Sequence, residues 1–194
     1  MEGQNNIYEV IMRRGGGKTP FILGGDFERG IAKIWLEKSM STLVVDDFPH
    51  PKYAHVPILS PKDYSRLSTH PGIYRTIASL QHMPALIESI SEKVYNTAVV
   101  FEDSYKYFPK KFGDAEIALL GNSKQKNVDI FWMDWCWGLV SPDKLRFTNY
   151  FVIGPTTDTP AVREEYLHGC YDACLTAHKE VMKKGKYQIV DSGI

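Results

Sequence analysis

The residues with the clearest chemical meaning form a glycine-rich stretch near the start of the chain. It lies between an apolar run and a segment whose apolar residues recur at helical spacing. Glycines allow backbone N–H groups to turn inward around phosphate oxygens, and the start of a helix adds partial positive charge. The sequence therefore predicts a P-loop that binds ATP through Arg14, Gly15, Gly16, Gly17, Lys18 and Thr19.

Two side chains of this loop have separate expected tasks. Lys18 is expected to reach the β- and γ-phosphates, and the Thr19 hydroxyl is expected to bind Mg²⁺. The full motif is G-x-x-x-x-G-K-[ST], and Met12 stands in its first glycine position. That glycine serves the turn rather than the phosphate contact, so the loop can keep its ligands. The alternative is a glycine-rich surface loop with an incidental lysine.

An apolar run that ends in two carboxylates supplies a second candidate group. Thr97–Asp103 has the composition of a strand buried on both faces, and functional groups sit at the carboxyl ends of parallel strands. We expect Glu102 to support the metal and Asp103 to orient the attacking water. The usual order is Asp then Glu, and Asp reaches about one methylene less far. The alternative is a strand that ends in two solvated acids.

A rival acidic strand lies earlier in the chain. Ser41–Asp47 is also apolar and ends in Asp46 and Asp47. It leads into a proline-rich loop and follows the glycine stretch closely. The sequence therefore leaves it open as the strand that carries the metal-binding carboxylate, although Thr97–Asp103 is favoured.

The elements that must position these groups alternate between short β-rich runs and helical stretches. This alternation predicts an α/β fold, a P-loop NTPase with a mainly parallel central sheet flanked by helices. Strands are expected at Asn6–Met12, Ser41–Asp47, Gly72–Ile77, Thr97–Asp103, Asn127–Asp134, Phe147–Ile153 and Tyr187–Asp191. Helices are expected at Lys18–Lys38, Pro84–Tyr95, Asp114–Gln125 and Thr159–Lys184.

Length and composition limit the broad class. The 194 residues suit one domain spanning 1–194, and 43% apolar with 24% charged residues is ordinary for a globular protein. A formal net charge of zero argues against coating nucleic acid by bulk charge. We find no run long enough for a membrane span and no signal peptide, and three cysteines form no disulfide framework. We expect a soluble, cytoplasmic protein.

Three segments together resemble the FtsK–HerA class of P-loop ATPases, which have a RecA-like fold. The closest likeness is to the small viral genome-packaging ATPases and the phage-morphogenesis ATPases that are like zonula occludens toxin. The first two segments are the glycine stretch and the acidic strand end. The third runs from Leu120 to Asp134, where the family has a basic residue before a strand that ends in a polar γ-phosphate sensor. Lys124 stands in the place of the usual Arg, and Asp134 stands in the place of the usual Gln or His.

The resemblance implies an ATP-hydrolysing motor that translocates DNA, most often double-stranded, to package a viral genome. It implies a homo-oligomeric ring of five or six subunits, a capsid vertex as partner, and a place in the host cytoplasm or on the virion. It also implies an arginine finger from the neighbouring subunit. Arg75 and Arg146 are the candidates, and the sequence does not choose between them.

Three other functions remain open at this point. A phage-assembly ATPase would extrude single-stranded DNA, although such proteins usually carry a membrane span. A small nucleotide or metabolite kinase would need an arginine-rich lid, which we do not find. A non-hydrolysing, nucleotide-binding virion protein would tolerate the departures at Met12 and at the Glu102–Asp103 pair.

Other groups of chemically capable residues have simpler explanations. Cys170, Cys174 and His178 span about 12 Å of helix, so one zinc ion cannot contact all three, and a packed helix face is favoured. Aromatic residues around Trp135 could stack on bases, and the lysines at positions 106, 110 and 111 could line a DNA channel. Core packing and a solvated face are the commoner meanings of these patterns.

Overall fold

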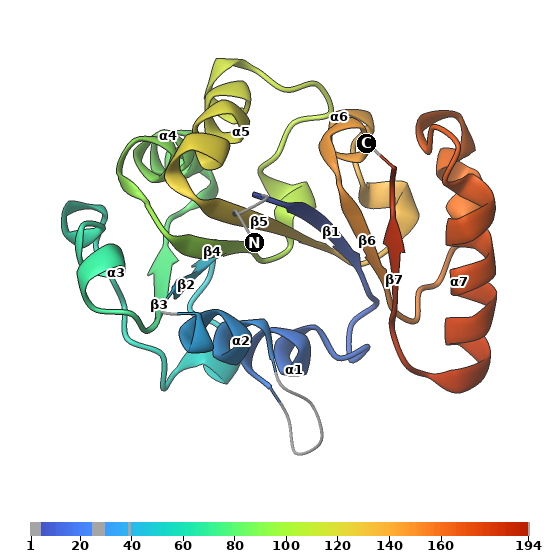
Figure 1. The fold of residues 1–194 in the computed structure, drawn as a ribbon, viewed down its shortest axis with the longest axis horizontal. Coiled ribbons are helices and arrows are strands. Elements are labelled where there is room, and N and C mark those ends of the chain that lie inside the picture. Colours follow the sequence, from blue (N-terminus) through green and yellow to red (C-terminus); the bar gives the residue numbers. More distant parts are fainter. Residues whose placement is uncertain (1–4, 25–29, 39, 194) are drawn as a thin grey trace. The chain divides into compact units, whose positions relative to one another are not determined.

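A computed structural model describes residues 5–24, 30–38 and 40–193. Seven strands form one sheet in the order β3-β2-β4-β5-β1-β6-β7, with helices flanking it (Figure 1). The strands are β1 Ile7–Ile11, β2 Ser41–Asp46, β3 Ile73–Ile77, β4 Thr97–Phe101, β5 Val128–Asp134, β6 Tyr150–Ile153 and β7 Gln188–Asp191. The expected α/β fold with a mainly parallel sheet is confirmed, and each predicted strand is present.

Helices connect these strands. The α-helices are α1 Lys18–Leu23, α2 Ile31–Glu37, α3 Arg66–Thr69, α4 Met83–Lys93, α5 Asp114–Lys126, α6 Pro142–Phe147 and α7 Tyr171–Lys184. Short 3-10 helices are η1 Pro51–Tyr53, η2 Pro61–Asp63, η3 Leu80–His82, η4 Ser104–Lys106, η5 Trp137–Leu139 and η6 Pro160–Tyr166. In the part of the chain that the structure describes, none of these helices has the length and apolarity to cross a membrane.

The chain forms two compact units, each discontinuous in sequence. The first unit contains Thr19–Glu102 and Phe112–Ile130, and the second contains Asn6–Lys18, Asp103–Lys111 and Phe131–Ile194. The chain therefore passes from one unit to the other between Lys18 and Thr19, and again between Glu102 and Asp103. The expectation of a single domain over 1–194 stays a prediction.

The first unit is built around β2, which is buried along its whole length. β2 pairs in parallel with both β3 and β4, with Val45 opposite Phe101 in β4. Helix α2 packs on β2, and α4 packs along α5 (Figure 1). Because this strand is apolar on both faces, it is buried from both sides, and its only strongly polar residue is the terminal Asp46.

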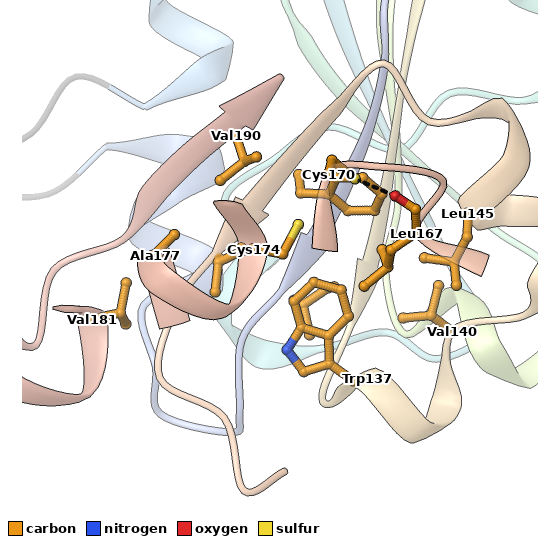
Figure 2. Packing of buried hydrophobic residues seen from close by; sticks show 12 residues of the cluster. Trp137, Val140, Leu145, Leu167, Cys170, Cys174, Ala177, Val181 and Val190 are labelled. Carbon is orange, nitrogen blue, oxygen red and sulfur yellow. Dashed lines mark hydrogen bonds between the residues drawn. The ribbon is translucent and has the colours of Figure 1, made fainter. Parts of the chain in front are cut away.

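The second unit pairs β1 in parallel with β6, and β6 in antiparallel with the edge strand β7. Helix α7 packs against β6 and β7 (Figure 1). Figure 2 shows the apolar cluster between them, in which Cys170 and Cys174 are packed with Trp137 and Val181. The predicted packed face of this helix is confirmed, since Cys174, Ala177, His178 and Val181 are its buried residues.

The expected helix over Thr159–Lys184 is wrong in one respect. η6 ends at Tyr166 and α7 begins at Tyr171, so the segment holds two helices rather than one. Between them His168 has φ 33° and Gly169 has φ 92°. Positive φ values cannot continue a right-handed helix, and the glycine at this position was the available signal in the sequence.

The helices also differ from expectation at two other places. The expected helix Lys18–Lys38 is divided, because α1 ends at Leu23 and α2 begins at Ile31, with residues 25–29 outside the described part. Helix α6 was not predicted. The Ser141 hydroxyl accepts a hydrogen bond from the Lys144 N–H, and Pro142 occupies the first turn. A Ser-Pro start of this kind is a recognisable helix signal.

The neighbouring residues Val181 and Met182 provide a test of the packed face of α7. Val181 is 0% exposed and Met182 is 52% exposed. We expect Val181→Ala to lower the free energy of unfolding by about 2 kcal/mol, because the removed methyl groups leave a cavity. Met182→Ala should change it by about 0.5 kcal/mol or less. Urea unfolding of both variants measures this, and equal effects would contradict the assigned face.

Candidate functional site

The glycine-rich stretch forms a tight turn directly after β1. The Arg13 N–H donates to the Pro155 carbonyl at 2.8 Å, and the Gly16 N–H donates back to the Arg13 carbonyl at 2.9 Å. Gly15 has φ 73° and Gly17 has φ 101°, in the region that favours glycine. A Cβ at either of these two positions would meet no heavy atom within 4 Å. Glycine is therefore favoured at these two positions by the positive φ angles of the backbone, and not by a lack of room for a side chain.

Met12, the departure from the usual motif, is accommodated by a glycine elsewhere. The Met12 side chain is 1% exposed. A Cβ added to Gly154 would lie 2.3 Å from Met12 Cγ, which is a steric clash. The Met12 N–H donates to the Asp134 carbonyl at 3.0 Å. The Met12 side chain therefore fits because Gly154, on the segment after β6, has no side chain in the space that Met12 fills.

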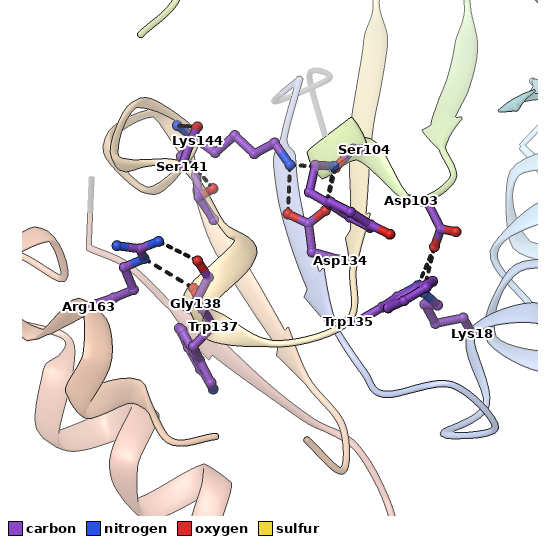
Figure 3. Close-up of polar contacts among 12 residues, drawn as sticks. Lys18, Asp103, Ser104, Asp134, Trp135, Trp137, Gly138, Ser141, Lys144 and Arg163 are labelled. Atoms are coloured by element: carbon purple, nitrogen blue, oxygen red, sulfur yellow. Dashed lines mark hydrogen bonds and ion pairs between the residues drawn. The ribbon is translucent and has the colours of Figure 1, made fainter. Parts of the chain in front are cut away.

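Lys18 forms an ion pair with Asp103 in the second unit (Figure 3). Lys18 Nζ lies 3.1 Å from Asp103 Oδ1, and Lys106 Nζ lies 3.4 Å from Oδ2. The Trp135 indole N–H also donates to Asp103. Burial alone would raise the pKa of Asp103, but Lys18, Trp135 and Lys106 outweigh it and lower the pKa below its ordinary value. Asp103 is therefore an ionised carboxylate held by three donors.

Trp135 lies against the basic residues of the glycine loop. The Arg14 guanidinium is 4.1 Å from the ring centroid of Trp135, and Lys18 Nζ is 5.4 Å from it. Tyr105 contacts the same indole edge-on, with ring centroids 5.3 Å apart. Trp132 is fully buried, as core packing predicts. Trp135 thus connects the loop that carries Lys18 with the turn that carries Asp103.

Asp134, the residue in the sensor position, lies in the interior of the second unit. It is 0% exposed, and its Oδ2 lies 2.6 Å from Lys144 Nζ. Its Oδ1 accepts hydrogen bonds from the Ser104 hydroxyl and the Tyr105 N–H, both at 2.9 Å. Both carboxylate oxygens are therefore engaged within the protein (Figure 3). A sensor role for Asp134 stays a prediction, while this geometry favours a structural one.

Lys144 was missed by the sequence analysis. It is fully buried on α6, and it also donates to the Ser104 hydroxyl. The rings of Phe108 and Trp132 lie 5.7 and 5.9 Å from its Nζ. A lysine beside Asp143 and Arg146 in the sequence resembles a surface helix residue, so no local signal marks it as buried.

Glu9 on β1 completes this buried charged group. Burial, followed by the negative charge of Asp134, raises the pKa of Glu9 well above its ordinary value, and Lys144 offsets this only in part. A protonated Glu9 can donate to Asp134, whereas an ionised Glu9 would leave both oxygens buried without a donor. Burial beside Asp134 therefore favours the protonated form of Glu9 in the folded protein.

The first unit holds a separate group of oxygen ligands. The Glu102 N–H donates to the Val45 carbonyl at 2.9 Å, so Asp46 and Glu102 follow neighbouring positions at the carboxyl ends of β2 and β4. The Tyr53 hydroxyl donates to Glu102, and the Thr19 hydroxyl interacts with the same phenol. Asp46 was considered a rival to Glu102, but the parallel register brings both carboxylates to the same end of the sheet.

Burial and neighbouring negative charge act on Asp46 in this group. Burial raises the pKa of Asp46 to about 6, and the negative charges of Glu102 and Asp47 add to the effect. Two partly buried carboxylates with a hydroxyl nearby are the oxygen ligands that Mg²⁺ prefers. Among the described residues no group of three or more His, Cys, Asp and Glu side chains could hold a metal ion, so the assignment of Thr19 and Glu102 as metal ligands stays a prediction. Tyr53 was not singled out by the sequence, because its contact depends on the path of the proline-rich loop.

The two candidate arginines differ in exposure. Arg75 on β3 is 9% exposed, and residues Pro57 and Leu59 hydrogen-bond to its backbone along the strand. The side chain of Arg146 on α6 is 55% exposed and pairs with Asp143 at 3.2 Å. An arginine that acts on a neighbouring subunit must be accessible, and this favours Arg146.

No protein-family model matches the sequence, and no curated protein does. Among solved structures, the genome packaging NTPase B204 from Sulfolobus turreted icosahedral virus 2 in complex with ATP-gammaS is 13% identical, with a TM-score of 0.73 over 97% of this chain and 93% of that chain. B204, the DNA-packaging ATPase from Sulfolobus Turreted Icosahedral Virus, is 11% identical, with a TM-score of 0.68 over 98% and 94%.

The N-terminal domain of zonular occludens toxin from Neisseria meningitidis is 15% identical over 76% of this chain and 75% of that chain, with a TM-score of 0.42. No conclusion rests on that match. The two matches to B204 show that the chain has the fold of these viral packaging NTPases. The expected P-loop NTPase fold, and the resemblance to this class at the level of fold, are confirmed.

The raised pKa of Glu9 gives a testable dependence of stability on pH. Unfolded Glu9 should ionise near its ordinary value of 4.5, while the folded group stays protonated beside Asp134 and Lys144. Folding stability from this group is complete below that value and is lost as pH rises toward the folded pKa, by about 1.4 kcal/mol per pH unit. Glu9→Gln keeps a hydrogen-bond donor near Asp134 but cannot ionise, so this loss of folding stability with rising pH should disappear.

Urea unfolding of the parent and of Glu9→Gln between pH 5 and pH 8 measures the effect. The variant should gain stability relative to the parent as pH rises. Glu92→Gln, which changes an exposed acid on α4, is the control and should follow the parent. Parallel pH profiles for all three proteins would show that Glu9 is not held protonated.

Proposed function

We propose that this chain is an ATPase that drives DNA translocation, and that it packages a viral genome into a capsid. The observation that carries this proposal is the contact between Lys18 of the glycine loop and the strand-end carboxylate of Asp103, 3.1 Å apart. The fold supports the same conclusion, because B204, whose fold it shares, is a genome packaging NTPase. Structures of B204 in complex with ATP-gammaS and AMPPCP support ATP as the ligand.

The phosphate side of the proposed site lies in the second unit. The glycine loop offers backbone N–H groups to the phosphates, and Lys18 offers its ammonium. In the structure that ammonium is paired with Asp103, so phosphate oxygens would take over as its anionic partner. Asp103 would then keep the donors from Trp135 and Lys106 and have an oxygen available to accept a hydrogen bond from water.

The lowered pKa of Asp103 bears on how it works. An ionised carboxylate of low basicity orients a water molecule well but removes its proton weakly. Phosphoryl transfer has a loose transition state that needs little proton removal in advance, so positioning of the water is the main task. The order Glu102 then Asp103 is compatible with two separate roles, in which Glu102 binds the metal and Asp103 positions the water.

The metal side lies in the first unit. Thr19, Asp46 and Glu102 would hold Mg²⁺, and Tyr53 fixes one oxygen of Glu102 by hydrogen bonding. Bound Mg²⁺ neutralises charge that develops on the phosphate oxygens. Lys18 and Thr19 are consecutive in the chain, as are Glu102 and Asp103.

The remaining partners follow from the same proposal. A homo-oligomeric ring would bring the exposed Arg146 of one subunit to the nucleotide of the next and complete its charge neutralisation. Lys110 and Lys111 are exposed after η4, and Lys106 ends that helix, so these lysines can contact the phosphates of double-stranded DNA. A capsid vertex would be the docking partner, and assembly would take place in the host cytoplasm.

The first test removes the phosphate contact. Lys18→Ala should lower the rate of phosphate release from ATP on the order of 100-fold, because the charge that stabilises the transferring phosphate is lost. The Lys18 side chain is 11% exposed and pairs with Asp103, so the melting temperature is measured beside the activity to show that the variant folds. Lys33→Ala on α2, which is exposed, is the control and should keep parental activity. Turnover by Lys18→Ala at the parental rate would refute the P-loop assignment.

The second test asks whether subunits share a site. Arg146→Ala and Lys18→Ala should each be nearly inactive, and mixing them should restore part of the activity. One subunit would then supply an intact Lys18 and its neighbour an intact Arg146. ATPase rates of the mixture against each variant alone measure this, and Arg163→Ala in place of Arg146→Ala is the matched control.

DNA dependence belongs to the same measurement. Double-stranded DNA should raise the ATPase rate, and the stimulation should fall as salt increases, because phosphate contacts release counterions. A chain that stays monomeric with ATP at high concentration and shows no response to DNA would exclude the motor, and a small-molecule kinase would then become the leading alternative.

A further inference from the structure

A buried lysine that the proposed chemistry does not use lies within the second unit. Lys144 is 0% exposed, and its ammonium is enclosed by the Asp134 carboxylate, the Ser104 hydroxyl and the rings of Phe108 and Trp132. Burying a lysine charge is costly unless a partner compensates for it. Asp134 balances the charge, and the Ser104 hydroxyl accepts from a second N–H of the ammonium, which links the ion pair to the residue that follows Asp103.

Ser104 directly follows Asp103 in a strained turn. Asp103 has φ 48° and ψ 44°, a left-handed conformation that non-glycine residues rarely adopt. Such a conformation persists only when its surroundings hold it. The Ser104 hydroxyl donates to Asp134 Oδ1, the Tyr105 N–H donates to the same oxygen, and Lys144 donates to Ser104.

The same ion pair also supports the other side of the turn. Trp135, which follows Asp134 in the chain, donates its indole N–H to the Asp103 carboxylate. Lys144 fixes the Asp134 side chain, and that side chain holds the two residues that come after Asp103. The carboxylate of Asp103 is thus bounded by Trp135 on one side and by the Ser104–Tyr105 backbone on the other (Figure 3).

We propose that Lys144 is a positioning residue that, through Asp134 and Ser104, holds the left-handed turn at Asp103 and so sets the direction of its carboxylate. This role rests on the proposed ATPase function, in which Asp103 orients the attacking water. Lys144 has no contact with nucleotide in this scheme. Its effect on catalysis passes entirely through Asp103.

Two variants separate the contacts of the Ser104 hydroxyl from the ion pair between Lys144 and Asp134. Ser104→Ala removes the hydroxyl that joins the pair to the turn and leaves Lys144 and Asp134 paired. Lys144→Met removes the ammonium at similar length but leaves Asp134 buried without its partner, so this variant can lose stability. Ser104→Ala is therefore the primary test, and the result does not depend on whether Lys144→Met folds.

The decisive measurement is a double-mutant cycle on the ATPase rate with Asp103→Asn. Ser104→Ala should lower kcat roughly tenfold to a hundredfold, because a misplaced carboxylate positions water poorly, while KM for ATP changes less than about twofold. In the Asp103→Asn background, Ser104→Ala should cause no further loss. Multiplicative losses in the cycle would show that Ser104 acts independently of Asp103 and would overturn the proposal.

A readout independent of turnover completes the experiment. Amide hydrogen exchange at Tyr105 should accelerate in Ser104→Ala, because the turn loses the hydroxyl contacts to Asp134 and Lys144. It should also accelerate in Lys144→Met if that variant folds, because the acceptor Asp134 is then no longer held by the ammonium. Ser141→Ala is the matched control, since it weakens the start of α6 without changing the Lys144 ammonium. It should leave both kcat and the exchange at Tyr105 unchanged. Unchanged exchange at Tyr105 in Ser104→Ala would overturn the proposal.

The outcomes also distinguish failure of the proposed ATPase function from failure of the positioning role of Lys144. If the parent shows no ATP turnover that Lys18→Ala abolishes, the proposed function fails, and the positioning role fails with it. If turnover depends on Lys18 but the cycle is multiplicative or Tyr105 exchange is unchanged, only the role of Lys144 fails.

Discussion

The buried ion pair between Lys144 and Asp134 is the interaction on which most of the second unit depends. It connects α6, the end of β5 and the turn after β4, and the Asp134 carbonyl also accepts the Met12 N–H at the end of β1. Removing one member of such a pair costs about 3–5 kcal/mol, because the other charge stays buried without a partner. The pair is therefore a fixed point around which the backbone segments that carry Lys18 and Asp103 are ordered.

The charges around this fixed point are arranged in a consistent way. In the interior, burial and the negative charge of Asp134 raise the pKa of Glu9 well above its ordinary value, so the neutral form of this acid is favoured. The outer carboxylate, Asp103, is surrounded by Lys18, Lys106 and the indole of Trp135, and it stays ionised. Burial protonates the inner acid, and neighbouring cations keep the outer acid charged. Carboxyl groups of similar ordinary pKa are thus shifted in opposite directions by burial and by neighbouring cations.

The sequence predicted the features that local composition determines. All seven strands were expected, and the buried parallel strands β2 and β4 are the most recognisable, because they are continuous apolar runs. The glycine loop and the acidic strand end follow from short motifs. Tyr53, Lys144 and the pairing of Asp46 with Glu102 were not predictable in this way. Each depends on contacts between residues distant in sequence, and a single lysine or tyrosine in a polar segment carries no local sign of burial. Helix α6 and the break at His168–Gly169 did have local signals, a Ser-Pro start and a glycine, which the helical periodicity obscured.

The packing of Met12 against Gly154 has a consequence for how such loops can vary. The glycine that the usual motif places at the start of the loop is absent, and the free space is found instead on the segment after β6, where a Cβ would collide with Met12. The two positions together hold one large side chain and one hydrogen atom. Chains of this fold are therefore free to exchange the two sizes, with glycine at position 12 and a larger residue at position 154, but not to enlarge both. A motif search that demands glycine at the first position would overlook a chain that, like this one, has a large residue at position 12 and glycine at position 154.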